Sequence, residues 1–176
     1  MGCLRPLRNL ALFGLLAAIA MSAPAADPAQ LRCTLGVPAQ AASGKPVPLR
    51  LTIANTGREE VHVLIWGTPF EGWFAPFVVV RHDGKPLEYL GPTVKRGDPA
   101  REEYVRIEAG RARSKSINLD EAFDLSQPGQ YRVEPRIVLH DVVVDGQALI
   151  PRRRAQHVAL PLNCDPVKFE VRSTPR

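Results

Sequence analysis

The sequence has 176 residues, of which 45% are hydrophobic and 23% are charged, and its formal net charge is +5 at pH 7. A chain of this length fits one domain, and its 17 prolines and 13 glycines favour many turns between short strands over long helices. Without two arginines near the N-terminus, 21 basic and 18 acidic residues remain, a net charge of about +3. This mild excess argues against nucleic-acid binding, and we interpret the run Arg152-Arg153-Arg154 as a solvated loop.

Residues 1–25 have the composition of an export signal. Two arginines precede an apolar run of about a dozen residues, which is too short to span a bilayer. Small residues at 23–25 fit an A-x-A cleavage site, so we expect cleavage after Ala25 or Ala26 and one domain over 27–176. An uncleaved anchor is the alternative. We expect a secreted or periplasmic protein without a stable membrane anchor after cleavage.

Two cysteines, Cys33 and Cys164, lie beyond the expected signal, whereas Cys3 lies within it. One pair in an oxidising compartment predicts one disulfide. It would close a loop of about 130 residues and stabilise the fold by about 4–5 kcal/mol in the chain-entropy view. Two free thiols or a metal pair are the alternatives, and the wide separation argues against metal binding.

In chain order, the first predicted strands are 30–36, 47–55 and 61–66, with a small-residue turn at 39–46. Leu49, Leu51 and Ile53 alternate with polar residues, which is typical of a half-buried strand. A turn beginning at Asn55 leads to the strand at 61–66, so we expect these two strands to form a hairpin.

Residues 77–81 and 86–90 flank Asp83-Gly84, a strong hairpin signal. Glycine and proline then predict a loop over 91–100. The remaining predicted elements are strands at 104–107, 114–119, 131–134, 137–144, 158–162 and 167–171, and a helical turn at 120–125. Strands at intervals of 8–15 residues predict an all-β, immunoglobulin-like antiparallel β-sandwich.

Tyr131 follows a Pro-Gly turn at the start of a predicted strand. This arrangement resembles the tyrosine corner of immunoglobulin-like sandwiches. An ordinary core tyrosine is the alternative interpretation.

Residues suited to catalysis or metal binding are scattered. The four histidines, His62, His82, His140 and His157, share no helical spacing, and none is followed by Glu as in H-E-x-x-H. His140-Asp141 is the closest thing to a ligand pair, but neighbours on a strand point to opposite faces. There is no G-x-S-x-G and no Gly-rich phosphate loop. We therefore expect no catalytic residue, no metal ligand and no cofactor.

Aromatic residues gather between positions 66 and 74, where the sequence reads W-G-T-P-F-E-G-W-F. Such a segment either plugs one end of a sandwich or forms a contact surface. Its four candidate contact residues are Trp66, Phe70, Trp73 and Phe74.

Several short motifs together resemble a known family. They are L-I-W-G-T-P-F-E-G at 64–72, D-G-K-P at 83–86, Y-L-G-P at 89–92, V-K-R-G-D-P at 94–99, D-L-S at 124–126 and P-G-Q-Y-R-V at 128–133. In this order they resemble the N-terminal, propeptide-like domain of the peptidyl-Lys metalloendopeptidases, the deuterolysin-like or aspzincin zinc proteases. The resemblance extends over about 49–133.

In that family the domain precedes a catalytic domain with H-E-x-x-H and a further zinc-binding Asp, and this sequence has no such motif. No catalytic or metal residue is therefore carried over. The resemblance implies a β-sandwich pro-domain, and propeptides of secreted proteases assist folding or block the active site. We expect an exported binding module whose partner is a secreted metallopeptidase, which it inhibits or helps to fold.

Two other function classes stay open: an active zinc metalloendopeptidase, and an envelope-associated structural sandwich. For the binding module, Lys95-Arg96 in the predicted loop at 91–99 is the candidate contact. Lys95 would enter a lysine-selecting pocket as a pseudo-substrate, and a rigid loop would lose little entropy on binding. The alternative is that both side chains are merely solvated and the aromatic residues plug the sandwich.

Overall fold

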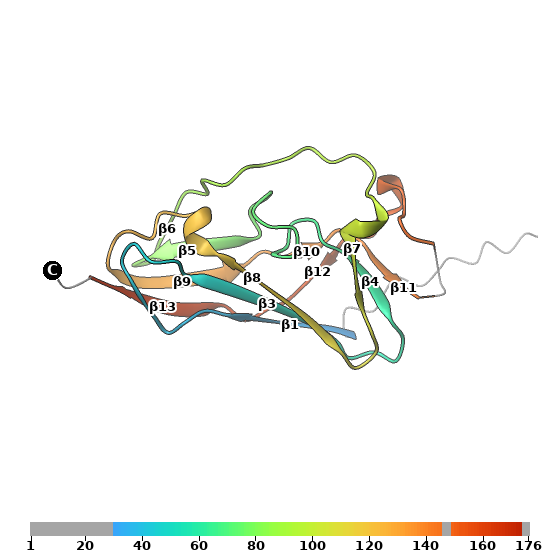
Figure 1. The fold of residues 1–176 in the computed structure, drawn as a ribbon, viewed down its shortest axis with the longest axis horizontal. Coiled ribbons are helices and arrows are strands. Elements are labelled where there is room, and N and C mark those ends of the chain that lie inside the picture. Colours follow the sequence, from blue (N-terminus) through green and yellow to red (C-terminus); the bar gives the residue numbers. More distant parts are fainter. Residues whose placement is uncertain (1–29, 146–148, 174–176) are drawn as a thin grey trace, which may run out of the picture.

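The computed structural model describes residues 30–145 and 149–173, which form an all-β fold (Figure 1). The export signal expected over 1–25 lies outside these ranges. The helical elements that lie wholly within them are short 3₁₀ turns at Arg101–Glu103, Leu119–Glu121 and Arg154–Gln156. None of the described helices is long and apolar enough to cross a membrane.

The strands form two larger sheets, which contain all the strands of five or more residues, and two smaller groups of strands of two to four residues. The first sheet has the order β1-β3-β8, and the second has the order β2-β13-β9-β5-β6. The smaller groups are β11-β4-β7 and β10-β12. All pairs are antiparallel except β2 with β13. The bounds are β1 Leu31–Gly36, β2 Gln40–Ala42, β3 Pro48–Asn55, β4 Val61–Leu64, β5 Val78–His82, β6 Lys85–Pro86, β7 Tyr104–Ile107, β8 Ala112–Asn118, β9 Gly129–Pro135, β10 Val138–Leu139, β11 Val142–Val144, β12 Leu160–Pro161 and β13 Val167–Arg172.

One hydrophobic core joins the two larger sheets. Leu49, Leu51 and Ile53 of β3 are fully buried, as their alternation predicts. They belong to the same buried cluster as Val80 of β5 and Val133 of β9, on the opposite sheet. Because both sheets bury one face against this cluster, the fold is the expected immunoglobulin-like antiparallel sandwich.

The hairpin predicted around Asp83-Gly84 is confirmed. β5 pairs with β6, and the two turn residues have φ angles of 47° and 82°. Positive φ at both central residues gives the twist that two-residue hairpin turns need. The return strand is short, since β6 ends at Pro86.

The other predicted hairpin, between 47–55 and 61–66, is wrong. β3 pairs with β1 and β8, whereas β4 pairs with β7 and β11. The buried Asn55 side chain donates to the carbonyls of Glu59 (2.7 Å) and Ile107 (3.1 Å), which ties the end of β3 to β7. The chain therefore leaves one sheet at this turn and enters another.

Two further segments differ from expectation. The predicted turn at 39–46 contains the short strand β2, which pairs in parallel with β13. The predicted strand at 137–144 is divided into β10 and β11, which belong to different sheets. The break falls at His140-Asp141, where His140 is exposed and Asp141 is fully buried.

Tyr131 has the geometry expected of a tyrosine corner. Its ring is buried near the start of β9 and stacks on Phe169 at a centroid distance of 5.0 Å. Its hydroxyl donates to the carbonyl of Gln127 four residues upstream, at 2.7 Å. The hydrogen bond gives the buried hydroxyl a partner and fixes the turn that enters β9.

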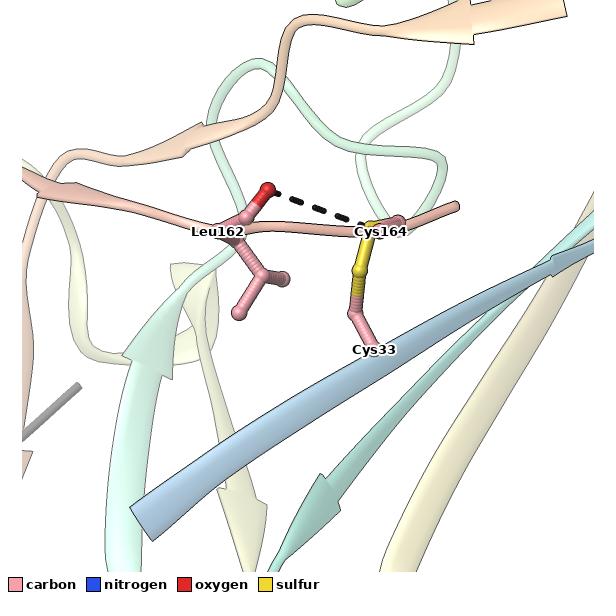
Figure 2. Close-up of a disulfide and its surroundings, with 3 residues drawn as sticks. All are labelled: Cys33, Leu162 and Cys164. Carbon is pink, nitrogen blue, oxygen red and sulfur yellow. Dashed lines mark hydrogen bonds between the residues drawn. A yellow bond between two sulfur atoms is a disulfide. The ribbon is translucent and has the colours of Figure 1, made fainter. Parts of the chain in front are cut away.

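The disulfide expected between Cys33 and Cys164 is present (Figure 2). Cys33 lies on β1, and Cys164 lies in the connection between β12 and β13, two residues beyond Leu162. The bond spans 131 positions of sequence. It ties the first strand to the segment that leads into the last.

Candidate functional site

A cleft of about 700 Å³ is the candidate site. It lies where the turn after β4, the loop that connects β6 with β7, the break between β10 and β11, and the segment before β12 come together. In Figure 1 the loop runs along the outside of the molecule, from β6 to β7. The residues that line the cleft are Trp66, Gly67, Phe74, Ala75, Val94, Lys95, Arg96, His140, Arg154, His157 and Ala159.

The turn after β4 forms one wall of the cleft. The Thr68 hydroxyl donates to the carbonyl of Ile65 at 2.6 Å, and Gly67 adopts a φ of 63°. The Gly67 N–H donates to the Glu71 carboxylate at 3.0 Å. The W-G-T-P-x-E-G motif therefore forms a closed turn that holds a carboxylate inside it.

Glu71 and Arg96 join this turn to the loop. The Glu71 side chain is only 6% exposed and forms an ion pair with Arg96. Burial raises the pKa of the Glu71 carboxyl, while the Gly67 N–H and the Arg96 charge act in the opposite direction. The Arg96 guanidinium also lies 5.3 Å from the Trp66 ring centroid and 5.9 Å from that of Phe74. The two most distinctive motifs of the sequence are thus in direct contact.

Further hydrogen bonds fasten the loop at its C-terminal end. The backbone N–H of Arg154 donates to Asp98 at 2.8 Å, and the Arg154 guanidinium donates to the Arg96 carbonyl at 2.7 Å. Glu103 accepts from the Ala100 N–H and from the Trp66 indole, both at 2.7 Å. The loop is therefore anchored at several points and is preorganised.

Two histidines flank Trp66 in the cleft. The ring centroids of His140 and His157 lie 6.4 Å and 5.9 Å from that of Trp66, both in edge-on geometry. His157 Nε2 lies 3.1 Å from the Arg152 carbonyl and donates to it in the tautomer that carries the proton on Nε2. Partial desolvation of the His140 ring in the cleft lowers its pKa, and the positive charges of His157, Arg154 and Arg96 lower it further.

The structure divides the six predicted contact residues into two groups. Lys95, Arg96, Trp66 and Phe74 line the cleft, where Lys95 is exposed and Phe74 is 41% exposed. Trp73 is instead buried in the core, stacks on Phe77 at 4.6 Å and donates to the Asn118 carbonyl. Phe70 also packs against the core. The aromatic segment therefore both plugs the sandwich and borders the cleft.

The interpretation of the three consecutive arginines as a solvated loop is wrong for Arg152, which is half-buried, whereas Arg153 and Arg154 are exposed. Arg152 forms an ion pair with Asp141, which is completely buried and also accepts from the Tyr104 hydroxyl at 2.8 Å. Arg154 lines the cleft, and only Arg153 is exposed without a side-chain contact among those described. The missed cleft residues, His140, Arg154 and His157, lie more than 40 positions after Lys95. No local spacing pattern links them to it.

Within the part of the chain that the structure describes, one group of side chains could hold a metal ion. Glu60, His62 and Asp145 each place a ligand atom within 4.8 Å of the others. Glu60 and His62 alternate along the chain at β4, so they share a face. Arg106 already forms an ion pair with Glu60, which disfavours a cation there. The expectation that no metal binds stays a prediction.

No family model matches the chain. A protein described as "Extracellular protease" from Aeromonas hydrophila is 33% identical over 102 residues, which cover 58% of this chain. The match spans only 29% of that protein's length. The similarity is to part of an extracellular protease, and it does not single out the peptidyl-Lys metalloendopeptidases.

Solved structures show only remote likeness. The CARDB domain of PF1109 from Pyrococcus furiosus has a TM-score of 0.34 at 15% identity, over 81% of this chain and 91% of that one. A β-glucosidase from Listeria innocua has a TM-score of 0.33 at 15% identity, over 80% of this chain and 16% of that one. Scores this low carry no functional information.

Proposed function

We propose that this protein is an exported, non-catalytic binding module that acts on a secreted peptidase as an inhibitor or folding aid. The observation that carries the proposal is the similarity of 102 residues to part of an extracellular protease. Because the module resembles one portion of a protease, we expect it to bind a protease of the same kind. The disulfide supports export, because such bonds persist in oxidising compartments.

The cleft supplies the contact surface for this partner. Phe74 offers an exposed apolar ring, and Lys95 presents an ammonium group beside it. Arg96 is held by Glu71 and the rings, so Lys95 is the cation on the cleft side of this loop that remains able to pair with an acidic group of a partner's lysine-selecting pocket. Because the loop is already anchored, its binding costs little conformational entropy.

The proposal is tested with a secreted peptidyl-Lys metallopeptidase. Inhibition predicts that the mature chain lowers its activity at a fixed substrate concentration. Assistance in folding predicts a higher yield of active peptidase after dilution from denaturant. Lys95→Ala should weaken either effect by about 30-fold or more in effective concentration, as expected for loss of an interface charge pair of about 2 kcal/mol.

Lys115→Ala is the matched control, since Lys115 is an exposed lysine on β8 and does not line the cleft. Absence of inhibition, folding assistance and binding would contradict the proposal. Casein cleavage by the mature chain alone, abolished by a chelator, would contradict its non-catalytic part.

A further inference from the structure

The side chains that line the cleft carry an uneven balance of charge. Lys95, Arg96 and Arg154 are cationic, His140 and His157 can become so, and no carboxylate is among the lining residues. Arg96 is neutralised by Glu71. Over 30–145 and 149–173, no carboxylate lies within ion-pair distance of the side chain of Lys95 or Arg154. Asp98 accepts from the backbone N–H of Arg154, but neither of these two cations has an ion-pair partner among the described residues.

The shape of the site strengthens their effect. A concave surface with walls of low polarity focuses the field of the charges that line it. Trp66, Phe74 and Val94 supply the apolar part of the lining. The same positive charge contributes to the lowered pKa of His140, after burial itself. The cleft thus combines an anion-attracting potential with aromatic surface.

We propose that the cleft binds an acidic peptide segment, with a carboxylate between Lys95 and Arg154 and an apolar side chain against Trp66 and Phe74. A bare inorganic anion would leave the aromatic surface unused, whereas a peptide satisfies both parts of the lining. The volume of about 700 Å³ lies in the range of sites that hold small ligands. This inference deepens the proposed function, because the segment would belong to the partner peptidase.

The residues that surround the two cations are held in place before binding. Arg154 is fixed by Asp98 through its backbone and by the Arg96 carbonyl through its side chain. Trp66 is fixed by its indole hydrogen bond to Glu103. Of the two cations, only Lys95, which is exposed and has no described ion pair, has to become ordered, so binding loses little entropy.

The test is a calorimetric titration of the mature chain with the peptide acetyl-Leu-Asp-Glu-Phe-amide. Its isostere acetyl-Leu-Asn-Gln-Phe-amide carries no charge and is the matched ligand. We expect the acidic peptide to bind saturably and the neutral peptide to bind at least 10-fold more weakly. Added salt should lower the affinity for the acidic peptide. Tryptophan fluorescence should change on binding, because Trp66 lines the cleft while Trp73 lies in the core.

Variants locate the binding. Lys95→Gln and Arg154→Gln should each lower the affinity for the acidic peptide by at least 10-fold. Lys115→Gln on β8 should leave this affinity unchanged. Arg154 also holds the loop, whereas the Lys95 side chain makes no ion pair with the other described residues, so Lys95→Gln is the decisive variant. His140 gives an independent NMR signal: its pKa should rise when a bound carboxylate offsets His157, Arg154 and Arg96.

Several results would overturn the inference: equal affinity for both peptides, unchanged affinity in Lys95→Gln, or tighter binding of inorganic phosphate or heparin than of the acidic peptide. The outcome is separable from that of the proposed function. If the chain binds the peptide but not the peptidase, the cleft is a peptide-binding site and the proposed partner is wrong. If the chain binds the peptidase but not the peptide, and excess peptide does not compete, only the inference about the cleft is wrong.

Discussion

At Asp141 a carboxylate is completely enclosed by protein. It accepts hydrogen bonds from the Tyr104 hydroxyl at 2.8 Å and from Arg152 Nε at 2.9 Å, and the Arg152 guanidinium neutralises its charge. Removing one partner of such a pair leaves a buried charge without compensation. The pair also joins the segment after β10 to the segment that carries Arg154 and so supports one side of the cleft.

We therefore expect Arg152→Ala to lower the free energy of unfolding by about 3–5 kcal/mol. Urea titration followed by circular dichroism measures the change. Arg153→Ala is the control, because the Arg153 side chain is next in sequence and is exposed. Its free energy of unfolding should stay within about 0.5 kcal/mol of the wild-type value. Equal stability of the two variants would show that the buried pair contributes nothing.

Tyr104 should make the free energy of unfolding decrease at alkaline pH. Burial, followed by the hydrogen bond and charge of Asp141, raises its pKa above the ordinary tyrosine value. The folded chain then keeps this proton where the unfolded chain loses it, so stability is intact below about pH 10 and falls as the pH rises further. Tyr104→Phe should flatten this decline between about pH 9.5 and 11, leaving the contributions of Tyr89 and Tyr131, whose pKa values are also raised. An identical pH profile in wild type and variant would refute this assignment.

At the scale of elements, the turn after β4 and the loop before β7 depend on one ion pair. Arg96→Ala leaves the Glu71 carboxylate buried and uncompensated. We expect a loss of about 2–3 kcal/mol, less than for a fully enclosed pair because the Arg96 side chain is 25% exposed. Hydrogen exchange should also accelerate over 94–98. Arg101→Ala, at an exposed position of the same connection, should change neither quantity, and unaltered exchange in Arg96→Ala would count against the anchoring role.

Individual strands are easier to predict than their partners. The alternation of Leu49, Leu51 and Ile53 correctly indicates which face of β3 is buried, and Asp83-Gly84 correctly indicates a turn, because both signals are local. The false hairpin between β3 and β4 has an equally good local pattern. The hairpin does not form because β1 and β8 occupy both edges of β3, and β8 comes from a distant part of the chain.

The same limit applies to the cleft. Lys95, Trp66 and Phe74 could be selected from the sequence because they lie in unusual local segments. Arg154 and His140 join them only because the chain after β9 returns to this end of the molecule. Buried ion pairs such as Asp141 with Arg152 are also invisible locally, since burial is a property of the complete fold.

At the scale of the whole molecule, the disulfide closes a loop that includes nearly all the described strands. Replacing both cysteines, as in Cys33→Ala with Cys164→Ala, avoids a stray thiol and should lower the free energy of unfolding by about 2–5 kcal/mol. Denaturant titration of the variant and the oxidised wild type measures this difference. Thiol titration of the exported, denatured and unreduced wild type should find no reactive thiol, and two reactive thiols would contradict the pairing.

The central claim is that the exported chain binds a secreted peptidase through the face that carries Lys95 and Phe74. The most direct measurement is a calorimetric titration of the mature chain into a peptidyl-Lys metallopeptidase, repeated with Lys95→Ala, Phe74→Ser and Lys115→Ala. We predict saturable one-to-one binding that the first two variants weaken by about 30-fold and 10-fold and that Lys115→Ala leaves unchanged. No binding, or equal affinity for all four chains, would contradict the account.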